Sequence, residues 1–132
     1  MPTATDAQLL SFNNWTIRVN PSQAMSPRLL LLLHGWTGDE NSMWVFTRRF
    51  SSSYWMIAPR APHPVDPGGF SWRYMQTSAF GWPSFESLSP AADGLIRLID
   101  EYSASVGVDA TQFDVMGFSQ GAAMVNLLAM LH

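Results

Sequence analysis

The sequence has 132 residues and a mass of 14.7 kDa, which is enough for one domain but not for two. Hydrophobic residues make up 47% of the chain and charged residues only 13%, against about 25% in an ordinary soluble domain, so a disordered chain is excluded and a well-buried core is expected. The net charge of −3, with seven scattered arginines and no lysine, argues against a nucleic-acid partner, and the absence of cysteine excludes disulfides, thiolate zinc sites and a cysteine nucleophile.

The first third of the chain predicts strands. Residues 9–19 mix aliphatic and aromatic residues, and their second half alternates apolar with polar positions, as a half-buried strand does. Asn13 and Asn14 in this segment are typical of a tight turn, so one strand or a small hairpin is expected. Residues 29–33 form an apolar run without alternation, which at this length predicts a strand buried on both faces.

The middle of the chain combines short elements with a long irregular segment. Residues 42–50 predict a short helix with Asn41 or Ser42 as its cap, and residues 55–58 predict a second strand that ends at a proline. Residues 59–90 hold six of the nine prolines. A loop of this length in a small domain is usually functional.

The last third predicts two helices around a strand. Ser89 and Pro90 are typical of a helix start, with the serine as cap and the proline in the first position, and Gly107 ends that helix. Residues 112–116 predict a third strand, and residues 120–131 predict a helix so apolar on every side that it should be buried. The alternation of strands and helices predicts an α/β fold with a mostly parallel sheet and crossover helices.

The strongest motif is Gly117-Phe118-Ser119-Gln120-Gly121, which fits the pattern G-x-S-x-G. This pattern forms the sharp turn between a strand and a helix that lifts a nucleophilic serine to the top of a sheet. Glycines are needed because the serine backbone is strained and a Cβ two residues to either side would collide with neighbouring elements. The predicted strand before the motif and the helix after it favour Ser119 as the catalytic nucleophile. The alternative is a glycine-rich turn with an incidental serine.

A second motif, H-G-W-T-G at residues 34–38, directly follows the first buried strand. A strand that ends in His-Gly resembles the loop that binds the oxyanion in α/β-hydrolases. Acyl transfer requires two backbone N–H groups aimed at the developing negative charge, and we assign them to Trp36 and Gln120. Gly35 and Gly38 allow the backbone to bend toward a substrate. The alternative is an ordinary glycine-rich turn.

Four segments together resemble the phospholipase/carboxylesterase family of α/β-hydrolases, which includes the acyl-protein thioesterases. They are Leu32-Leu33-His34-Gly35, Ala58-Pro59-Arg60-Ala61-Pro62, Phe70-Ser71-Trp72 and Gly117-Phe118-Ser119-Gln120-Gly121-Ala122. The resemblance extends over residues 29–131. It implies hydrolysis of a small-molecule carboxylic ester or thioester through an acyl-serine intermediate, without a cofactor, and it implies that Trp72 lies beside the acyl pocket.

The sequence departs from this family in its catalytic triad, which runs in the order Ser, Asp, His. No aspartate follows Ser119, and His132 lies thirteen residues further along the predicted helix. That spacing corresponds to about 20 Å, far beyond hydrogen-bond reach. His34 is expected to be a structural residue of the oxyanion loop, and His63 lies in the proline-rich loop. The triad histidine and aspartate are therefore expected downstream of these residues.

The predicted sheet leads to the same expectation. Residues 113–116 would form an edge strand without a neighbour on one side, and the final helix would expose apolar surface. We therefore expect residues 1–132 to be a single incomplete α/β-hydrolase domain, truncated after the nucleophile helix, or one chain of a split or nicked protein. An oligomer or a complementing chain would then cover the edge. A stretch cut short for technical reasons is the plain alternative.

Aromatic residues fall into two groups. Trp44, Phe46 and Phe50 occur at helical spacing and are expected in the core. A second group lies in the long loop and is a candidate lining for a substrate pocket that accepts an acyl or aromatic group. Its members are Phe70, Trp72, Tyr74, Phe80 and Trp82.

Acidic residues outside the motifs are expected to be structural. Asp39 and Glu40 predict a solvated start to the following helix, and Asp114 predicts a buried, hydrogen-bonded group in the third strand. Asp39, Glu40 and His34 lack the spacing of a metal site, so no metal is expected.

The sequence thus predicts a serine hydrolase of the carboxylesterase or thioesterase type, with the 132 residues alone inactive. One alternative is a catalytically incomplete fragment that needs a second chain. Another is a peptidase, depolymerase or feruloyl-type esterase of the same fold. No apolar run is long enough to cross a bilayer and no signal peptide is visible, so a cytoplasmic location is expected.

Overall fold

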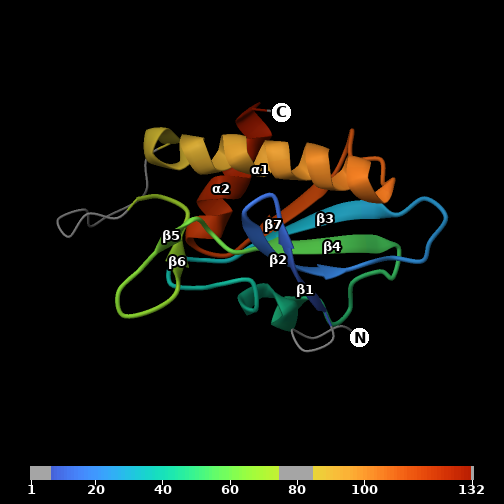
Figure 1. Cartoon of the computed structure of the whole chain (residues 1–132), viewed down its shortest axis with the longest axis horizontal. Coiled ribbons are helices and arrows are strands. Elements are labelled where there is room, and N and C mark those ends of the chain that lie inside the picture. The colour runs from blue at the N-terminus through green and yellow to red at the C-terminus, as the bar shows by residue number, and fades with distance from the viewer. Residues whose placement is uncertain (1–6, 75–84, 132) are drawn as a thin grey trace.

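The computed structural model describes residues 7–74 and 85–131. These residues form a five-stranded sheet in the order β1-β2-β4-β3-β7, with a separate two-stranded sheet, β5-β6, at one end (Figure 1). The strands are β1 Gln8–Phe12, β2 Trp15–Asn20, β3 Arg28–Leu33, β4 Tyr54–Pro59, β5 His63–Pro64, β6 Phe70–Ser71 and β7 Asp114–Gly117. The helices are the 3-10 helix η1 Ser42–Phe46, α1 Phe85–Val106 and α2 Gln120–Leu131.

The N-terminal strands confirm the predicted hairpin. β1 and β2 pair antiparallel, and the two residues between them, Asn13 and Asn14, have φ angles of 48° and 70°. Two left-handed residues in a row make the turn that matches the natural twist of a hairpin, and asparagine tolerates this conformation better than other residues with a side chain. β2 then pairs antiparallel with β4.

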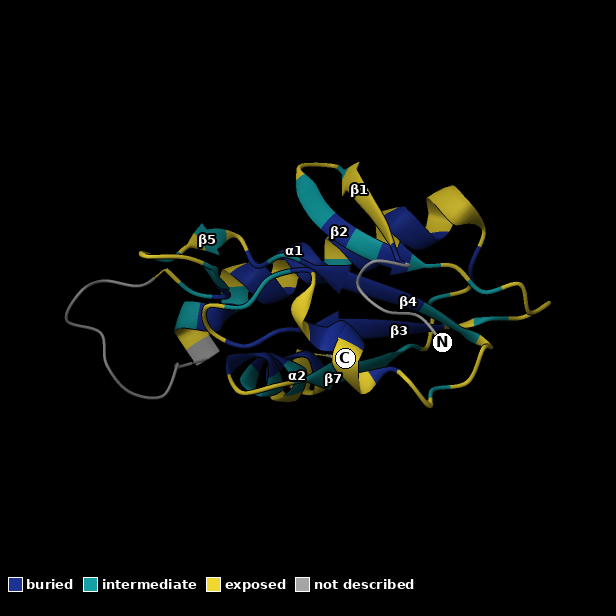
Figure 2. Cartoon of the chain, turned by 90° about the horizontal axis from the view of Figure 1, so that it is seen from below, coloured by how far each residue is buried: buried dark blue, intermediate teal, exposed yellow. Residues whose placement is uncertain are grey.

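The predicted parallel α/β arrangement is also confirmed. β3 pairs parallel with β4 on one side and parallel with β7 on the other. The apolar run of β3 is buried on both faces, because Leu29, Leu31 and Leu33 belong to the cluster that includes α1 and α2, whereas Leu30 and Leu32 contact the cluster that includes η1. Figure 2 shows β3 and β4 as buried strands, with exposed residues along β1 at one edge.

Two helices differ from their predicted bounds. η1 is a 3-10 helix that ends at Phe46 rather than an α-helix that reaches residue 50, and its cap residue, Asn41, makes no side-chain cap hydrogen bond. α1 begins at Phe85, so Pro90 lies inside the helix and not in its first position. The missing proline N–H removes one hydrogen bond in the second turn, a loss that the apolar residues this helix buries beyond Pro90 outweigh.

The helix α2 has the predicted bounds; it is buried on one side only, and it exposes apolar residues as an incomplete sheet predicts. Met124, Leu127 and Leu128 are buried in the core, whereas Met130 and Leu131 are 69% and 48% exposed. β7, which precedes α2, is an edge strand among the described strands, with β3 as its neighbour. None of the helices in the described part of the chain is long and apolar enough to cross a membrane.

Candidate active site

The two predicted motifs meet at one edge of the sheet. β3 and β7 are neighbouring parallel strands, and Leu33 at the end of β3 is in register with Gly117 at the end of β7. The segments that follow the two strands therefore leave the sheet side by side. In open α/β sheets this carboxyl edge is where ligands bind.

Ser119 lies on the sharp turn between β7 and α2. Its φ angle is 58°, a left-handed conformation that is strained for a residue with a side chain, and the residue is exposed. A Cβ on Gly117 would lie 2.2 Å from the carbonyl oxygen of Gly121, and a Cβ on Gly121 would lie 2.1 Å from that of Leu33. Only glycine fits at both positions, so the turn has the close backbone packing that the motif predicts.

The loop after β3 packs directly on this turn. A Cβ on Gly35 would lie 3.0 Å from the Phe118 carbonyl oxygen and 3.1 Å from the Ser119 Cβ. The N–H of Phe118 donates to the carbonyl of Leu33 at 3.1 Å. Backbone contacts thus bring the loop of residues 34–38 within van der Waals distance of the serine.

The directions of the two candidate oxyanion donors follow from the planarity of the peptide bond. The Gly35 carbonyl accepts the N–H of Gly38 at 3.0 Å, so the N–H of Trp36, in the same peptide unit, points the opposite way. The Ser119 carbonyl accepts the N–H of Ala122 at 2.9 Å, which turns the N–H of Gln120 away from the helix in the same manner. Neither the Trp36 nor the Gln120 N–H donates a hydrogen bond to the described residues.

His34 is buried and both of its ring nitrogens are occupied. Nε2 accepts the N–H of Ala61 at 3.0 Å, so the ring proton is on Nδ1, which donates to the Gly35 carbonyl at 2.6 Å. Burial lowers the pKa of His34 and keeps the ring neutral. His34 therefore orients the oxyanion loop and does not offer a nitrogen to Ser119.

Trp72 and Phe70, the two residues predicted to line a substrate pocket, lie in different environments. Trp72 is fully buried, and its indole N–H donates to the His34 carbonyl at 2.7 Å. Phe70 is half-buried beneath Arg60, whose guanidinium carbon lies 4.6 Å from the ring centre. Tyr74 is 70% exposed, while Phe80 and Trp82 lie outside the described residues. The lining of an acyl pocket by this group stays a prediction.

The prediction for Glu40 is wrong. Its side chain is 5% exposed and forms a two-bond ion pair with Arg60, Nε to Oε1 at 2.7 Å and Nη2 to Oε2 at 2.9 Å. The Arg60 guanidinium lowers the pKa of the Glu40 carboxyl. The ion pair links Glu40, which lies just beyond the loop of residues 34–38, to the segment after β4. The spacing of the two residues along the sequence does not predict this contact.

Asp114 is a structural group, as predicted, but it is not buried. Its carboxylate accepts two hydrogen bonds from Arg28, both at 2.8 Å, and a third from the Tyr54 hydroxyl at 2.8 Å. Its side chain is 37% exposed. No group of three acidic or histidine side chains in residues 7–74 and 85–131 could hold a metal ion.

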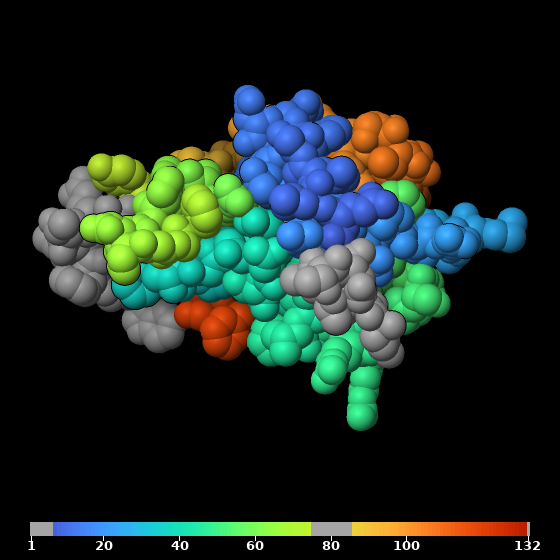
Figure 3. Space-filling model, turned by 60° about the horizontal axis from the view of Figure 1, so that its bottom comes forward, coloured from blue at the N-terminus to red at the C-terminus, as the bar shows by residue number. Residues whose placement is uncertain are grey.

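Both motifs carry an exposed aromatic residue. Phe118 is 59% exposed and its ring stacks on that of Phe46, 6.1 Å between centres, and Trp36 is 50% exposed. Phe46 is thus a surface residue that stacks on the elbow residue Phe118, and not the predicted core residue. In Figure 3 orange-red atoms of the C-terminal part of the chain reach the surface below the segment that contains η1.

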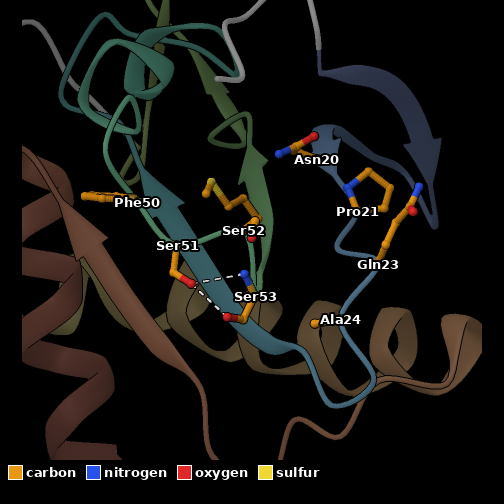
Figure 4. Close-up of a pocket in the computed structure, with 9 residues that line it drawn as sticks. Asn20, Pro21, Gln23, Ala24, Phe50, Ser51, Ser52 and Ser53 are labelled. Atoms are coloured by element: carbon orange, nitrogen blue, oxygen red, sulfur yellow. Dashed lines mark hydrogen bonds between the residues drawn. The ribbon is translucent and has the colours of Figure 1, made fainter.

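A cavity of about 460 Å³ lies at the opposite edge of the sheet (Figure 4). Its lining comes from the end of β2 and from the segment before β4, and it includes Asn20, Phe50 and Ser51–53. No charged residue lines it, and it is remote from Ser119, so it is not part of the candidate active site.

Comparison with solved structures identifies the fold as that of the α/β-hydrolases. A carboxylesterase from Mesorhizobium loti matches with a TM-score of 0.76 and 24% identity, over 96% of this chain and 59% of its own. A carboxylesterase from Bacillus cereus matches with a TM-score of 0.71 and 23% identity, over 90% of this chain and 53% of its own. The chain therefore spans between half and two thirds of the length of these structures. The sequence matches no protein-family model and no curated protein.

Proposed function

We propose that this chain carries the nucleophile and the oxyanion-binding loop of a serine hydrolase that cleaves carboxylic esters or thioesters. The observation that carries the proposal is the conformation of Ser119, exposed at a φ angle of 58° beside two backbone N–H groups, of Trp36 and Gln120, that bond to no described residue. This arrangement matches the needs of acyl transfer, in which N–H groups stabilise negative charge on the former carbonyl oxygen.

In the proposed reaction the Ser119 hydroxyl oxygen attacks the carbonyl carbon of the ester while a base takes its proton. The tetrahedral oxyanion accepts hydrogen bonds from Trp36 and Gln120, and the proton then passes to the departing alcohol or thiol. Water repeats the sequence on the acyl-serine and releases the acid. We assign the base and its acidic partner to residues outside this sequence, because His34, the histidine that packs next to the elbow among the described residues, uses both nitrogens within the fold.

The solved structures of similar fold support an ester substrate in general terms. Besides the two carboxylesterases, they include an acetyl xylan esterase from Aspergillus awamori and a membrane phospholipase A. The narrower assignment, to the phospholipase/carboxylesterase family, rests on the four sequence segments that resemble it. A cytoplasmic site of action belongs to the same proposal and can be checked by cell fractionation.

A second candidate is a chain that works only when a partner strand covers β7. Among the described strands β7 pairs with β3 alone, so the N–H and C=O groups on its other side are open to another strand. Size-exclusion chromatography with light scattering on the 132-residue chain tests this. A monomer that unfolds cooperatively would contradict the need for a partner.

Labelling with a fluorophosphonate, which reacts only with an activated serine, tests the nucleophile in the polypeptide as its cell produces it. Ser119→Ala should abolish labelling, and Ser53→Ala, an exposed serine at the opposite edge of the sheet, should leave it unchanged. Labelling that survives Ser119→Ala would show that the nucleophile is assigned wrongly.

A further inference from the structure

We propose that the side chains of Gln120 and Trp72 are positioning residues, which together hold the two oxyanion-binding N–H groups at a fixed separation. This inference rests on the proposed function. It adds a role for the side chain of Gln120, of which the proposed function uses only the backbone N–H, and it gives Trp72 a role besides the predicted place beside the acyl pocket.

The Gln120 side chain is buried and satisfied on both ends. It is 7% exposed, its Oε1 accepts the backbone N–H of Trp72 at 2.7 Å, and its Nε2 donates to the Ser71 hydroxyl at 3.1 Å. An amide buried without partners would destabilise the fold, and the two hydrogen bonds fix the side chain in one orientation. The elbow is thereby tied to the segment that follows β6.

Trp72 continues the connection to the other donor. Its indole N–H donates to the carbonyl of His34 at 2.7 Å, and its ring lies 5.1 Å from the imidazole of His34, centre to centre. His34 is two residues before Trp36. Two hydrogen bonds through Trp72 therefore link the residue that carries one donor to the loop that carries the other.

The segment before Trp72 is hydrogen-bonded to the other end of the same loop, at residues 37 and 38. The Phe70 carbonyl accepts the N–H of Thr37 at 3.0 Å, and the Phe70 N–H donates to the Gly38 carbonyl at 2.9 Å. A Cβ on Gly69 would lie 1.9 Å from the Thr37 carbonyl oxygen, so the backbones of the two segments approach more closely than any residue with a side chain would allow. Residues 69–72 thus contact the oxyanion loop on both sides of Trp36 and contact the elbow through Gln120.

Packing alone would not require these polar atoms. A phenylalanine could fill most of the volume of Trp72, and a methionine most of that of Gln120, without any hydrogen bond. Since an error of about 1 Å in the position of a catalytic group can lower a rate about 100-fold, a brace between the two donors would act on the transition state more than on substrate binding.

The test uses Trp72→Phe, which removes the indole N–H, with Trp55→Phe as the matched control. Trp55, which is partly buried in β4 and lies away from the elbow, also donates one indole hydrogen bond, to the Tyr102 hydroxyl at 3.1 Å. Steady-state hydrolysis of p-nitrophenyl acetate and inhibition by phenylboronic acid, which forms a tetrahedral adduct with the serine, are measured on the native polypeptide. For Trp72→Phe we expect kcat to fall about 10- to 100-fold with KM little changed, and boronate affinity to fall by the same factor. Trp55→Phe should leave all three values near those of the wild type.

A second pair of variants keeps the test valid if Trp72→Phe fails to fold. Gln120→Met retains the backbone N–H but removes both polar atoms of the side chain, whereas Ser71→Ala leaves the hydrogen bond from the Trp72 N–H to Gln120 Oε1 in place. Gln120→Met should lower kcat as Trp72→Phe does, and Ser71→Ala should lower it much less. Equal kcat in wild type and Gln120→Met, with only a lower melting temperature, would overturn the inference. If instead Ser119→Ala retained activity, the proposed function itself would fail.

Discussion

The substitution Gly121→Ala would separate the elbow from the oxyanion loop by a known amount. The added Cβ would lie 2.1 Å from the carbonyl oxygen of Leu33 and 2.7 Å from that of His34, and both are backbone atoms that cannot rotate away. An ordinary contact begins at 3.4 Å, so α2 and the end of β3 must move apart by about 1.3 Å. Overpacking of this kind destabilises by about 1–3 kcal/mol, and we expect the upper end of this range because backbone meets backbone.

One effect of the alanine opposes this loss. In a helix alanine is favoured over glycine by about 1 kcal/mol, so a Gly121→Ala variant without a collision would be more stable than the wild type. The expected net loss of unfolding free energy is therefore about 2 kcal/mol, which lowers the melting temperature of a chain of this size by roughly 6–10 °C. The displaced donors should also slow fluorophosphonate labelling about 100-fold.

Urea unfolding followed by circular dichroism and the rate of labelling measure the two effects. Gly68→Ala is the control, because a Cβ there meets no atom within 4 Å, and its unfolding free energy should stay within about 0.5 kcal/mol of the wild type. A Gly121→Ala variant as stable and as reactive as the wild type would refute the close packing of the elbow against β3.

Three further substitutions have expected outcomes. Glu40→Gln should lower the unfolding free energy by about 2 kcal/mol at pH 7, because it leaves the Arg60 guanidinium half-paired. Since the ion pair lowers the pKa of the Glu40 carboxyl, this difference in unfolding free energy should be fully present above the ordinary pKa of 4.5 and should vanish as the pH falls through the lower pKa of the folded state. Urea titrations at several pH values would measure it. Asn14→Val should destabilise by about 1–2 kcal/mol, whereas Asn14→Gly should not, because the left-handed φ of 70° disfavours a β-branched residue; thermal melts compare the two. Asp114→Asn should have a smaller effect than Glu40→Gln and lose it in 1 M NaCl, because its pair with Arg28 is exposed to solvent.

Local chemistry made part of this structure predictable from sequence. The paired asparagines at 13 and 14 require a tight turn, the apolar run in β3 fits only a strand buried on both faces, and the glycines at 117 and 121 permit the close packing around Ser119. In each case the residues that carry the prediction lie within a few positions of one another, although Gly121 packs against the distant Leu33. These are the features for which the sequence pattern and the structure agree.

The features that sequence did not predict depend on contacts between distant residues. Glu40 meets Arg60 twenty residues later, and the Gln120 side chain reaches Trp72 across forty-eight residues. The start of α1 also differs from the predicted one, because proline is most common in the first turn of a helix and Pro90 lies in the second. Periodicity reports which side of an element is apolar, but it does not report which polar group lies opposite.

The open edge of β7 and the base that Ser119 needs have a common geometric solution under the proposed function. Among the described residues, α2 follows the serine, the oxyanion loop packs beside it through Gly35, and residues 69–72 brace the elbow through Gln120. The side of Ser119 that these segments leave uncovered is the one beyond β7, away from β3. A strand that paired parallel with β7 would end at the same carboxyl edge as β3, and the loop after it would lie beside Ser119. The same segment would then cover the edge strand and bring a histidine to the serine. A partner chain that restores fluorophosphonate labelling of Ser119 should therefore also slow the hydrogen exchange of the backbone amides of β7.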